Sequence, residues 1–167
     1  MERQRKPMTE EAAWQRLSAL CAASEQCLYD MRRKMQSWDL PEGADRRLLQ
    51  RLLTEGYVDE QRYARAFVHD KSQYNRWGRR RIEFELHRRG IADATIADAL
   101  AGIADEENDD RLTELLKAKM RSVKARNDYE RMAKLMRFAA QRGFAADEVQ
   151  RCLRRLTNIE EDCYENP

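Results

Sequence analysis

The stretch that decides the fold runs from Gly56 to Ile91 and reads GYVDEQRYARAFVHDKSQYNRWGRRRIEFELHRRGI. It contains two patterns with apolar residues at helical spacing, separated by a Trp77-Gly78 corner. The second pattern ends at Gly90, which an apolar residue follows. Glycine is typical of this position after a helix because it adopts positive φ without steric penalty. The stretch therefore predicts two helices joined by a short corner.

Similar patterns occur before and after this stretch. Three sets of apolar residues line up between the copies: Trp14, Tyr63 and Leu112; Met31, Ile82 and Leu135; Leu40, Ile91 and Phe144. Repetition of this kind predicts an all-α fold of three tandem three-helix repeats. The repeats form an elongated array, which can be straight or curved. The predicted bounds are 9–56, 57–104 and 105–158, with flexible tails at 1–8 and 159–167. The alternative is an irregular helical bundle.

The composition favours helices and argues against a β fold, a metal-binding protein and a membrane protein. With only 6 Gly and 3 Pro in 167 residues, long helices are favoured over a turn-rich β fold. The 4 Cys show no CxxC spacing, so we expect reduced thiols and no metal site. The N-terminus lacks an apolar signal region, and no apolar run reaches the length of a membrane span. We therefore expect a cytoplasmic protein that does not enter a membrane.

Positive charge gathers in one place although the formal net charge is only +2. The basic residues of this cluster are Lys71, Arg76, Arg79, Arg80, Arg81, Arg88 and Arg89. On a helix, Glu85 can pair with Arg81 or Arg88. The arginines without an obvious local acid are Arg76, Arg79, Arg80 and Arg89. Because the guanidinium fork suits phosphates and carboxylates alike, the cluster predicts an anionic partner. The alternative is a solvated helix face with internal ion pairs.

Aromatic residues lie among these cations. Tyr74 and Trp77 can stack on unpaired bases, as in many single-strand-binding proteins. Packing at the helix–helix corner is the favoured interpretation of Trp77, whereas both interpretations stay open for Tyr74. We expect Trp14 and Trp38 in the core.

Basic residues recur in the first and third repeats, where they predict a stripe of sequence-independent phosphate contacts. They are Arg32, Arg33, Lys34, Lys117, Lys119, Arg121, Lys124, Arg126, Arg131, Lys134 and Arg137.

Motifs for catalysis are absent from the sequence. It has no GxxxxGK[ST], GxSxG or HExxH motif, and neither His69 nor His87 stands in a carboxylate pattern. The acidic run at residues 105–110 is interpreted as a polar linker and helix N-terminus. We therefore expect no enzyme, no catalytic residue and no cofactor.

GYVDEQRYA, followed by NRWGRRRIEFELHRRGI, resembles the core of the bacterial RecX regulatory proteins. The residues that carry the resemblance are Gly56, Tyr57, Val58, Asp59, Glu60, Arg62, Tyr63 and Ala64, then Gly78, Arg80, Arg81, Ile82, Glu85, Leu86, Arg89, Gly90 and Ile91. In the first repeat, ASEQCLYDMRRKM is similar to the family's opening helix through Glu25 and Arg33-Lys34-Met35.

This resemblance implies a nine-helix protein that binds the RecA recombinase filament. Members of the family generally lower the DNA-dependent ATP hydrolysis and strand exchange of RecA, and so act in recombination, DNA repair and the SOS response. The implied contacts with RecA carboxylates or filament-bound DNA centre on the basic cluster, and a monomer is the simplest expectation. Two other hypotheses remain: a single-stranded nucleic-acid-binding module that acts without RecA, and a helical scaffold for proteins alone.

Overall fold

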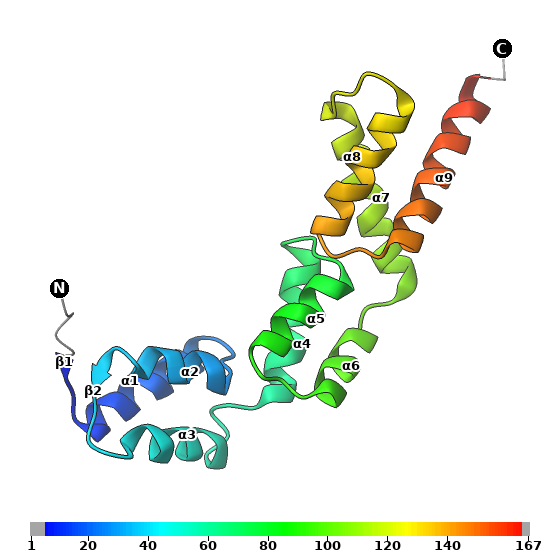
Figure 1. Ribbon diagram of the computed structural model, residues 1–167. Coiled ribbons are helices and arrows are strands. Elements are labelled where there is room, and N and C mark those ends of the chain that lie inside the picture. Colours follow the sequence, from blue (N-terminus) through cyan, green and yellow to red (C-terminus); the bar gives the residue numbers. More distant parts are fainter. Residues whose placement is uncertain (1–5, 165–167) are drawn as a thin grey trace. The chain divides into compact units, whose positions relative to one another are not determined.

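The computed structural model describes residues 6–164, which form nine α-helices and one short pairing of strands (Figure 1). The helices are α1 (Glu10–Ala23), α2 (Leu28–Met35), α3 (Ala44–Thr54), α4 (Glu60–Gln73), α5 (Arg79–Arg88), α6 (Asp93–Ala101), α7 (Asp105–Ser122), α8 (Asp128–Gln141) and α9 (Ala146–Tyr164). The strands β1 (Lys6–Pro7) and β2 (Trp38–Asp39) pair in parallel. The predicted all-α repeat fold is confirmed.

Two compact units make up the chain. The first comprises the chain up to Ala66 together with Leu86–Ile96, and the second comprises Phe67–Glu85 together with the chain from Ala97 onward. The helices α4, α5 and α6 thus each contribute residues to both units. Of the predicted tails, residues 1–5 and 165–167 lie outside the described residues, whereas 6–7 form β1 and α9 continues to Tyr164. The predicted repeat bounds stay a prediction.

In the first unit, α1, α2 and α3 enclose an apolar core. Its buried members are Ala13, Trp14, Leu17, Met31, Met35, Leu48, Leu49, Leu52 and Val58. The helix α1 begins where the Thr9 side chain accepts a hydrogen bond from the Ala12 N–H at 3.2 Å, as N-cap residues do. The Trp14 ring meets Tyr57 edge to face, and Arg51 lies 3.7 Å from its centroid. Trp14 is therefore a core residue, as predicted.

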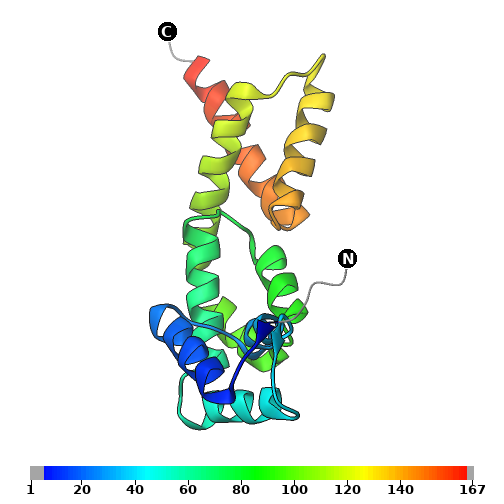
Figure 2. The ribbon, with the colours of Figure 1, turned by 90° about the vertical axis from the view of Figure 1, so that its left-hand side faces the viewer.

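In the second unit, α7, α8 and α9 lie side by side in both views (Figures 1 and 2). They bury Leu112, Leu115, Leu116, Leu135, Ala139, Phe144, Val149, Cys152, Leu153 and Leu156. Asn127 caps the start of α8, because its side chain accepts from the Glu130 N–H, and the helix ends before Gly143, whose φ is +94°. None of the described helices is both long enough and apolar enough to cross a membrane.

Two glycines of the second unit bring backbone directly against backbone. The Gly78 N–H donates to the Arg142 carbonyl at 2.7 Å, and the Arg80 N–H donates to the Gly143 carbonyl at 3.1 Å. A Cβ at Gly78 would lie only 2.4 Å from the Gly143 carbonyl carbon. The corner between α4 and α5 therefore packs on the loop between α8 and α9 at a distance that only glycine permits at this position.

We expect Gly78→Ala to lower the free energy of unfolding by about 1–3 kcal/mol, because the two backbones have to separate to admit the methyl group. Urea unfolding followed by circular dichroism measures this loss. Gly102→Ala is the matched control, since its Cβ would lie 3.2 Å from the nearest atom and its φ is not positive. Equal losses in the two variants would contradict the close contact.

Candidate partner-binding surface

The α4–α5 corner holds Trp77 between other side chains. The backbone N–H of Trp77 donates to the Lys71 carbonyl at 3.0 Å and so closes the end of α4. Over the indole ring lie the Lys71 Nζ, 5.0 Å from its centroid, and the Arg81 Cζ, 4.1 Å from it. Phe67 meets the same ring edge to face, and Arg81 also donates to the Gln141 carbonyl at 3.3 Å. These contacts support the packing interpretation of Trp77 and occupy Lys71 and Arg81.

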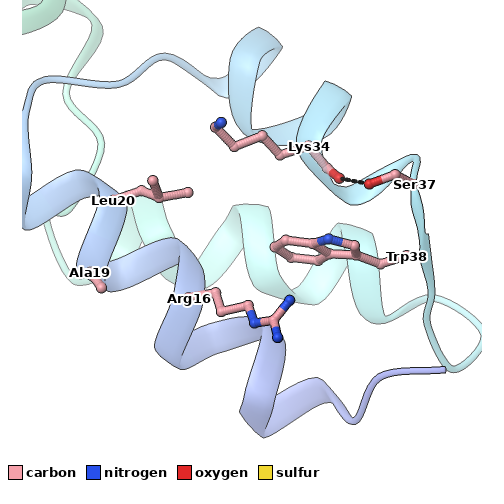
Figure 3. A pocket seen from close by; sticks show the side chains of 6 residues that line it. All are labelled: Arg16, Ala19, Leu20, Lys34, Ser37 and Trp38. Carbon is pink, nitrogen blue, oxygen red and sulfur yellow. Dashed lines mark hydrogen bonds between the residues drawn. The ribbon is translucent and has the colours of Figure 1, made fainter. Parts of the chain in front are cut away.

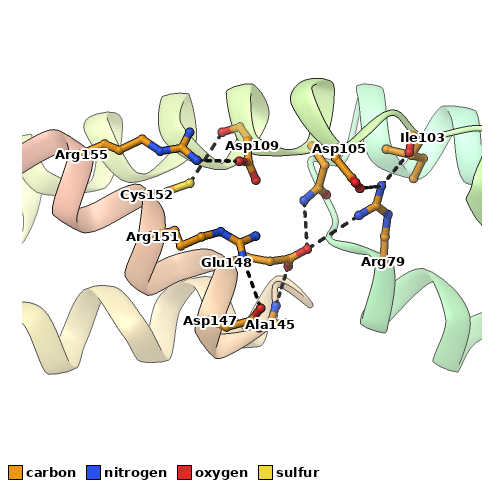
Figure 4. Close-up of polar contacts among 11 residues, drawn as sticks. Arg79, Ile103, Asp105, Asp109, Ala145, Asp147, Glu148, Arg151, Cys152 and Arg155 are labelled. Carbon is orange, nitrogen blue, oxygen red and sulfur yellow. Dashed lines mark hydrogen bonds and ion pairs between the residues drawn. The ribbon is translucent and has the colours of Figure 1, made fainter.

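Arg79 is held inside the second unit (Figure 4). Its side chain is only 28% exposed; one terminal nitrogen donates to the Ile103 carbonyl at 2.6 Å and lies 2.8 Å from the Asp105 carboxylate. The other nitrogen lies 3.8 Å from Glu148, which is 15% exposed. Arg79 has no local acid in the sequence, and its acids come instead from helices far along the chain.

Glu148 links this arginine to the start of α9. Its carboxylate also accepts from the Asn108 side-chain amide at 3.2 Å and from the Ala145 N–H at 2.8 Å. Figure 4 shows the Glu148 carboxylate, which comes from the first turn of α9, between Arg79 and Ala145. This half-buried carboxylate accepts two hydrogen bonds besides its contact with Arg79, and it keeps the guanidinium in place. Arg79 therefore joins α5 to α7 and α9 of the second unit.

Arg89 has a similar position in the first unit. It is 24% exposed, and its Nε lies 3.8 Å from the Asp30 carboxylate. The same carboxylate oxygen accepts from the Cys27 thiol at 3.3 Å and the Tyr63 hydroxyl at 3.4 Å. Burial raises the pKa of Cys27 to about 11 and also raises the pKa of Tyr63, so both groups stay protonated donors at neutral pH. Arg89 likewise has no local acid in the sequence, and its partner Asp30 comes from the distant helix α2.

The other residues of the predicted cluster are exposed. Tyr74 is 79% exposed, with its ring edge to face with His69. Arg76 has a left-handed backbone, with φ of 54°, and Arg80 lies in the first turn of α5. Neither of these two arginines forms an ion pair with a residue that the structure describes, whereas the exposed Arg88 has contacts within the chain. We call Tyr74, Arg76 and Arg80 the exposed corner set.

A groove of about 460 Å³ in the second unit gathers part of the predicted basic stripe. It is lined by Lys119, Ser122, Val123, Lys124, Lys134, Arg137, Phe138 and Gln141, and we call it the basic groove. None of these lining residues is acidic. Lys119 lies 4.9 Å from the Phe138 ring centroid, and Lys134 donates to the Lys124 carbonyl at 2.7 Å. Lys119, Lys124 and Arg137 form no ion pair with a side chain in residues 7–157.

One carboxylate stands near the edge of this groove. Glu130 accepts from the Arg126 N–H at 3.0 Å and pairs with Lys134 at 3.0 Å. These bonds lower the pKa of Glu130 to about 2, first through the Arg126 backbone and then through the Lys134 and Arg126 side chains. Because Glu130 stays ionised, it balances Lys134 but leaves the other three cations of the basic groove.

Sequence reasoning found the basic residues of this groove but not Phe138, whose spacing resembles that of an ordinary core residue. No group of three or more metal-ligating side chains in the described part of the chain is arranged to hold a metal ion. The described part of the chain thus presents to a partner the exposed corner set, the basic groove and, in the first unit, hollows that Trp38 lines.

Comparison with known proteins identifies the family. Residues 59–100 match the second three-helix domain of RecX, and residues 105–153 match the third. The regulatory protein RecX of Herbaspirillum seropedicae is 34% identical over 115 residues, which cover 69% of this chain and 71% of that protein. This chain belongs to the RecX family.

Other RecX proteins are more distant or longer. Regulatory protein RecX of Clostridium perfringens is 26% identical over 78% of this chain, and that of Bacillus cytotoxicus is 28% identical over 69%. The chain spans only 62% and 43% of these two relatives. All three relatives are described as regulatory proteins.

Solved RecX structures share the fold. A crystal structure of regulatory protein RecX superposes with a TM-score of 0.76 at 20% identity, over 84% of this chain and 70% of that one. RecX from Lactobacillus salivarius superposes with a TM-score of 0.72 at 17% identity, over 89% of this chain and 96% of that one. At these identities the likeness shows the fold alone.

We expect Arg79→Ala to lower the free energy of unfolding by about 1–3 kcal/mol, because the Ile103 carbonyl and the half-buried Glu148 lose a charged donor. Arg80→Ala is the matched control and should change it by no more than about 0.5 kcal/mol. Urea unfolding of both variants measures the difference. If both variants lose a similarly small free energy of unfolding, Arg79 does not stabilise the fold and is an exposed cation like Arg80.

Proposed function

We propose that this RecX-family chain binds the RecA recombinase filament and inhibits its DNA-dependent ATP hydrolysis and strand exchange. It would act in the cytoplasm, in recombination, DNA repair and the SOS response. The observation that carries the proposal is membership of the RecX family, which the sequence and the fold both support. The exposed corner set supplies cations that the rest of the described chain does not neutralise.

Regulation of this kind needs binding energy rather than chemistry. A ligand shifts an equilibrium only by as much as its affinities for the two states differ. A chain that prefers a filament state with slow ATP hydrolysis therefore inhibits without any catalytic residue. Guanidinium groups suit such a surface, because they pair in the same way with carboxylates and with phosphates.

The contacts of the arginines indicate which members of the basic cluster can contact the filament. Arg79, Arg81 and Arg89 are engaged by groups of the chain itself, so their replacement would disturb the fold as well as the surface. Arg76 and Arg80 are exposed and carry no such role. We assign the filament contact to these two arginines, with Tyr74 beside them in sequence.

The test measures single-strand-dependent ATP hydrolysis by RecA, titrated with this protein below stoichiometric amounts. We expect inhibition, and we expect Arg76→Glu/Arg80→Glu to raise the half-inhibitory concentration at least about tenfold, which is about 1.4 kcal/mol. The matched control is Arg46→Glu/Arg154→Glu, which reverses two exposed charges elsewhere. Unchanged hydrolysis at equimolar protein would contradict the proposal.

A second candidate function, single-stranded nucleic-acid binding without RecA, is favoured by the basic groove. Three cations there have no ion-pair partner among the described residues, and Phe138 offers an aromatic surface between them. Like charges held together repel one another, and a bound phosphate chain relieves that repulsion while it releases counterions. Such contacts are independent of base sequence and weaken steeply with salt.

For this function we expect a fluorescein-labelled oligothymidylate to bind in the absence of recombinase, as fluorescence anisotropy would show. Lys124→Gln/Arg137→Gln should weaken binding and reduce the slope of log affinity against log salt by about 0.7 for each phosphate that the variant no longer neutralises. Lys117→Gln/Arg121→Gln is the matched control, because both residues are exposed on α7 and do not line the groove. Absence of binding at physiological salt would exclude this function.

A further inference from the structure

An open hollow of about 530 Å³ lies in the first unit between α1 and the segment that joins α2 to β2 (Figure 3). It is lined by Arg16, Ala19, Leu20, Lys34, Ser37 and Trp38, and we call it the Trp38 hollow. Trp38, predicted as a core residue, is half-buried: it packs against the apolar core and also lines this hollow. Ala19 and Leu20 supply further apolar wall.

The polar groups around this hollow are donors. Figure 3 shows the Trp38 ring between the side chains of Lys34 and Arg16, which come from different helices. Neither cation forms an ion pair with a side chain in residues 7–157, and the Trp38 indole N–H has no hydrogen-bond acceptor in that range. The Ser37 hydroxyl is itself turned to the Lys34 carbonyl, to which it donates at 3.0 Å. An occupant therefore has to bring acceptors.

Three arginines of the first unit have carboxylate partners within the unit. The pairs are Arg47 with Glu10 at 2.8 Å, Arg51 with Glu55 at 2.7 Å and Arg62 with Glu25 at 2.8 Å. Arg16 and Lys34 thus differ from these neighbours, because an apolar surface rather than a carboxylate lies between them. This combination of two cations and an apolar wall suits a ligand with an apolar group next to negative charge.

Trp38 lines a second hollow whose charge has the opposite sign. This hollow has a volume of about 400 Å³ and contains the carboxylates of Asp39, Glu42 and Asp45, with Arg32 as its only basic lining residue. A polyphosphate chain that crossed Trp38 would meet these carboxylates, and like charges repel at such distances. A peptide avoids this repulsion, since its charge can change sign from one residue to the next.

We propose that the Trp38 hollow binds a peptide segment of a partner protein. An apolar side chain of that segment sits against Ala19, Leu20 and the Trp38 ring, and carboxylates beside it pair with Arg16 and Lys34. Basic residues on the other side of the apolar anchor face the acidic hollow. This inference concerns a protein partner of stated chemistry and does not depend on the recombinase role or on the basic groove.

The binding test uses the full chain labelled with ¹⁵N and the capped peptide Asp-Glu-Asp-Leu-Phe-Gly-Lys. In two-dimensional NMR spectra each tryptophan gives one indole N–H signal, and Trp38→Phe identifies the signal of Trp38. We expect the peptide to shift that signal saturably and to leave those of Trp14 and Trp77 in place. No shift at millimolar peptide would overturn the proposal.

The controls test separately the charges, the apolar anchor and the class of ligand on which binding depends. Arg16→Glu/Lys34→Glu should weaken peptide binding at least about tenfold, since two attractions become repulsions, whereas Arg46→Glu should leave it unchanged. Peptides with lysines in place of the acids, or serines in place of Leu-Phe, should not bind. Equal binding by these peptides or by the double variant would overturn the proposal. Displacement of the peptide by an oligothymidylate would overturn it in favour of a nucleic-acid site.

Discussion

The contact between Gly78 and Gly143 is the constraint on which the second unit depends. Because neither residue carries a side chain, the Gly78 and Arg80 N–H groups donate to the Arg142 and Gly143 carbonyls at a distance that a methyl group would block. This contact directs the start of α5 toward the loop before α9. Arg79 is then within reach of the Ile103 carbonyl, Asp105 and Glu148, and Arg81 lies over the Trp77 ring.

A net charge of +2 conceals two kinds of cation. Some arginines, such as Arg79 and Arg89, are half-buried and joined to carboxylates that belong to other helices. Others are exposed and have no ion-pair partner in the described chain, such as Arg76 and Arg80. Only the positive charge of the second kind is not neutralised within the described chain, and it can therefore pair with a partner. For a protein whose family is regulatory, this division separates the residues that maintain the fold from those that are free to act at its surface.

The two units differ in the ligand chemistry that their surfaces suit. In the second unit, the basic groove combines four cations with one aromatic ring and no acidic lining residue, which favours a polyanion. In the first unit, two cations flank an apolar hollow and carboxylates lie just beyond Trp38, which favours a short segment of mixed charge. The two proposed ligands, a phosphate chain and a peptide, therefore concern different surfaces of the chain.

Sequence by itself determined the helices, the three-helix repeats and the family, because apolar periodicity and glycine stops are local signals. Gly90 and Gly143 both have the positive φ that their position after a helix requires. Only the tertiary structure decided which cations are available, since the acids of Arg79 and Arg89 lie on distant helices. It also placed Phe138 among lysines and opened a hollow beside Trp38. Partners of this kind come together through chain folding, which no spacing along the sequence records.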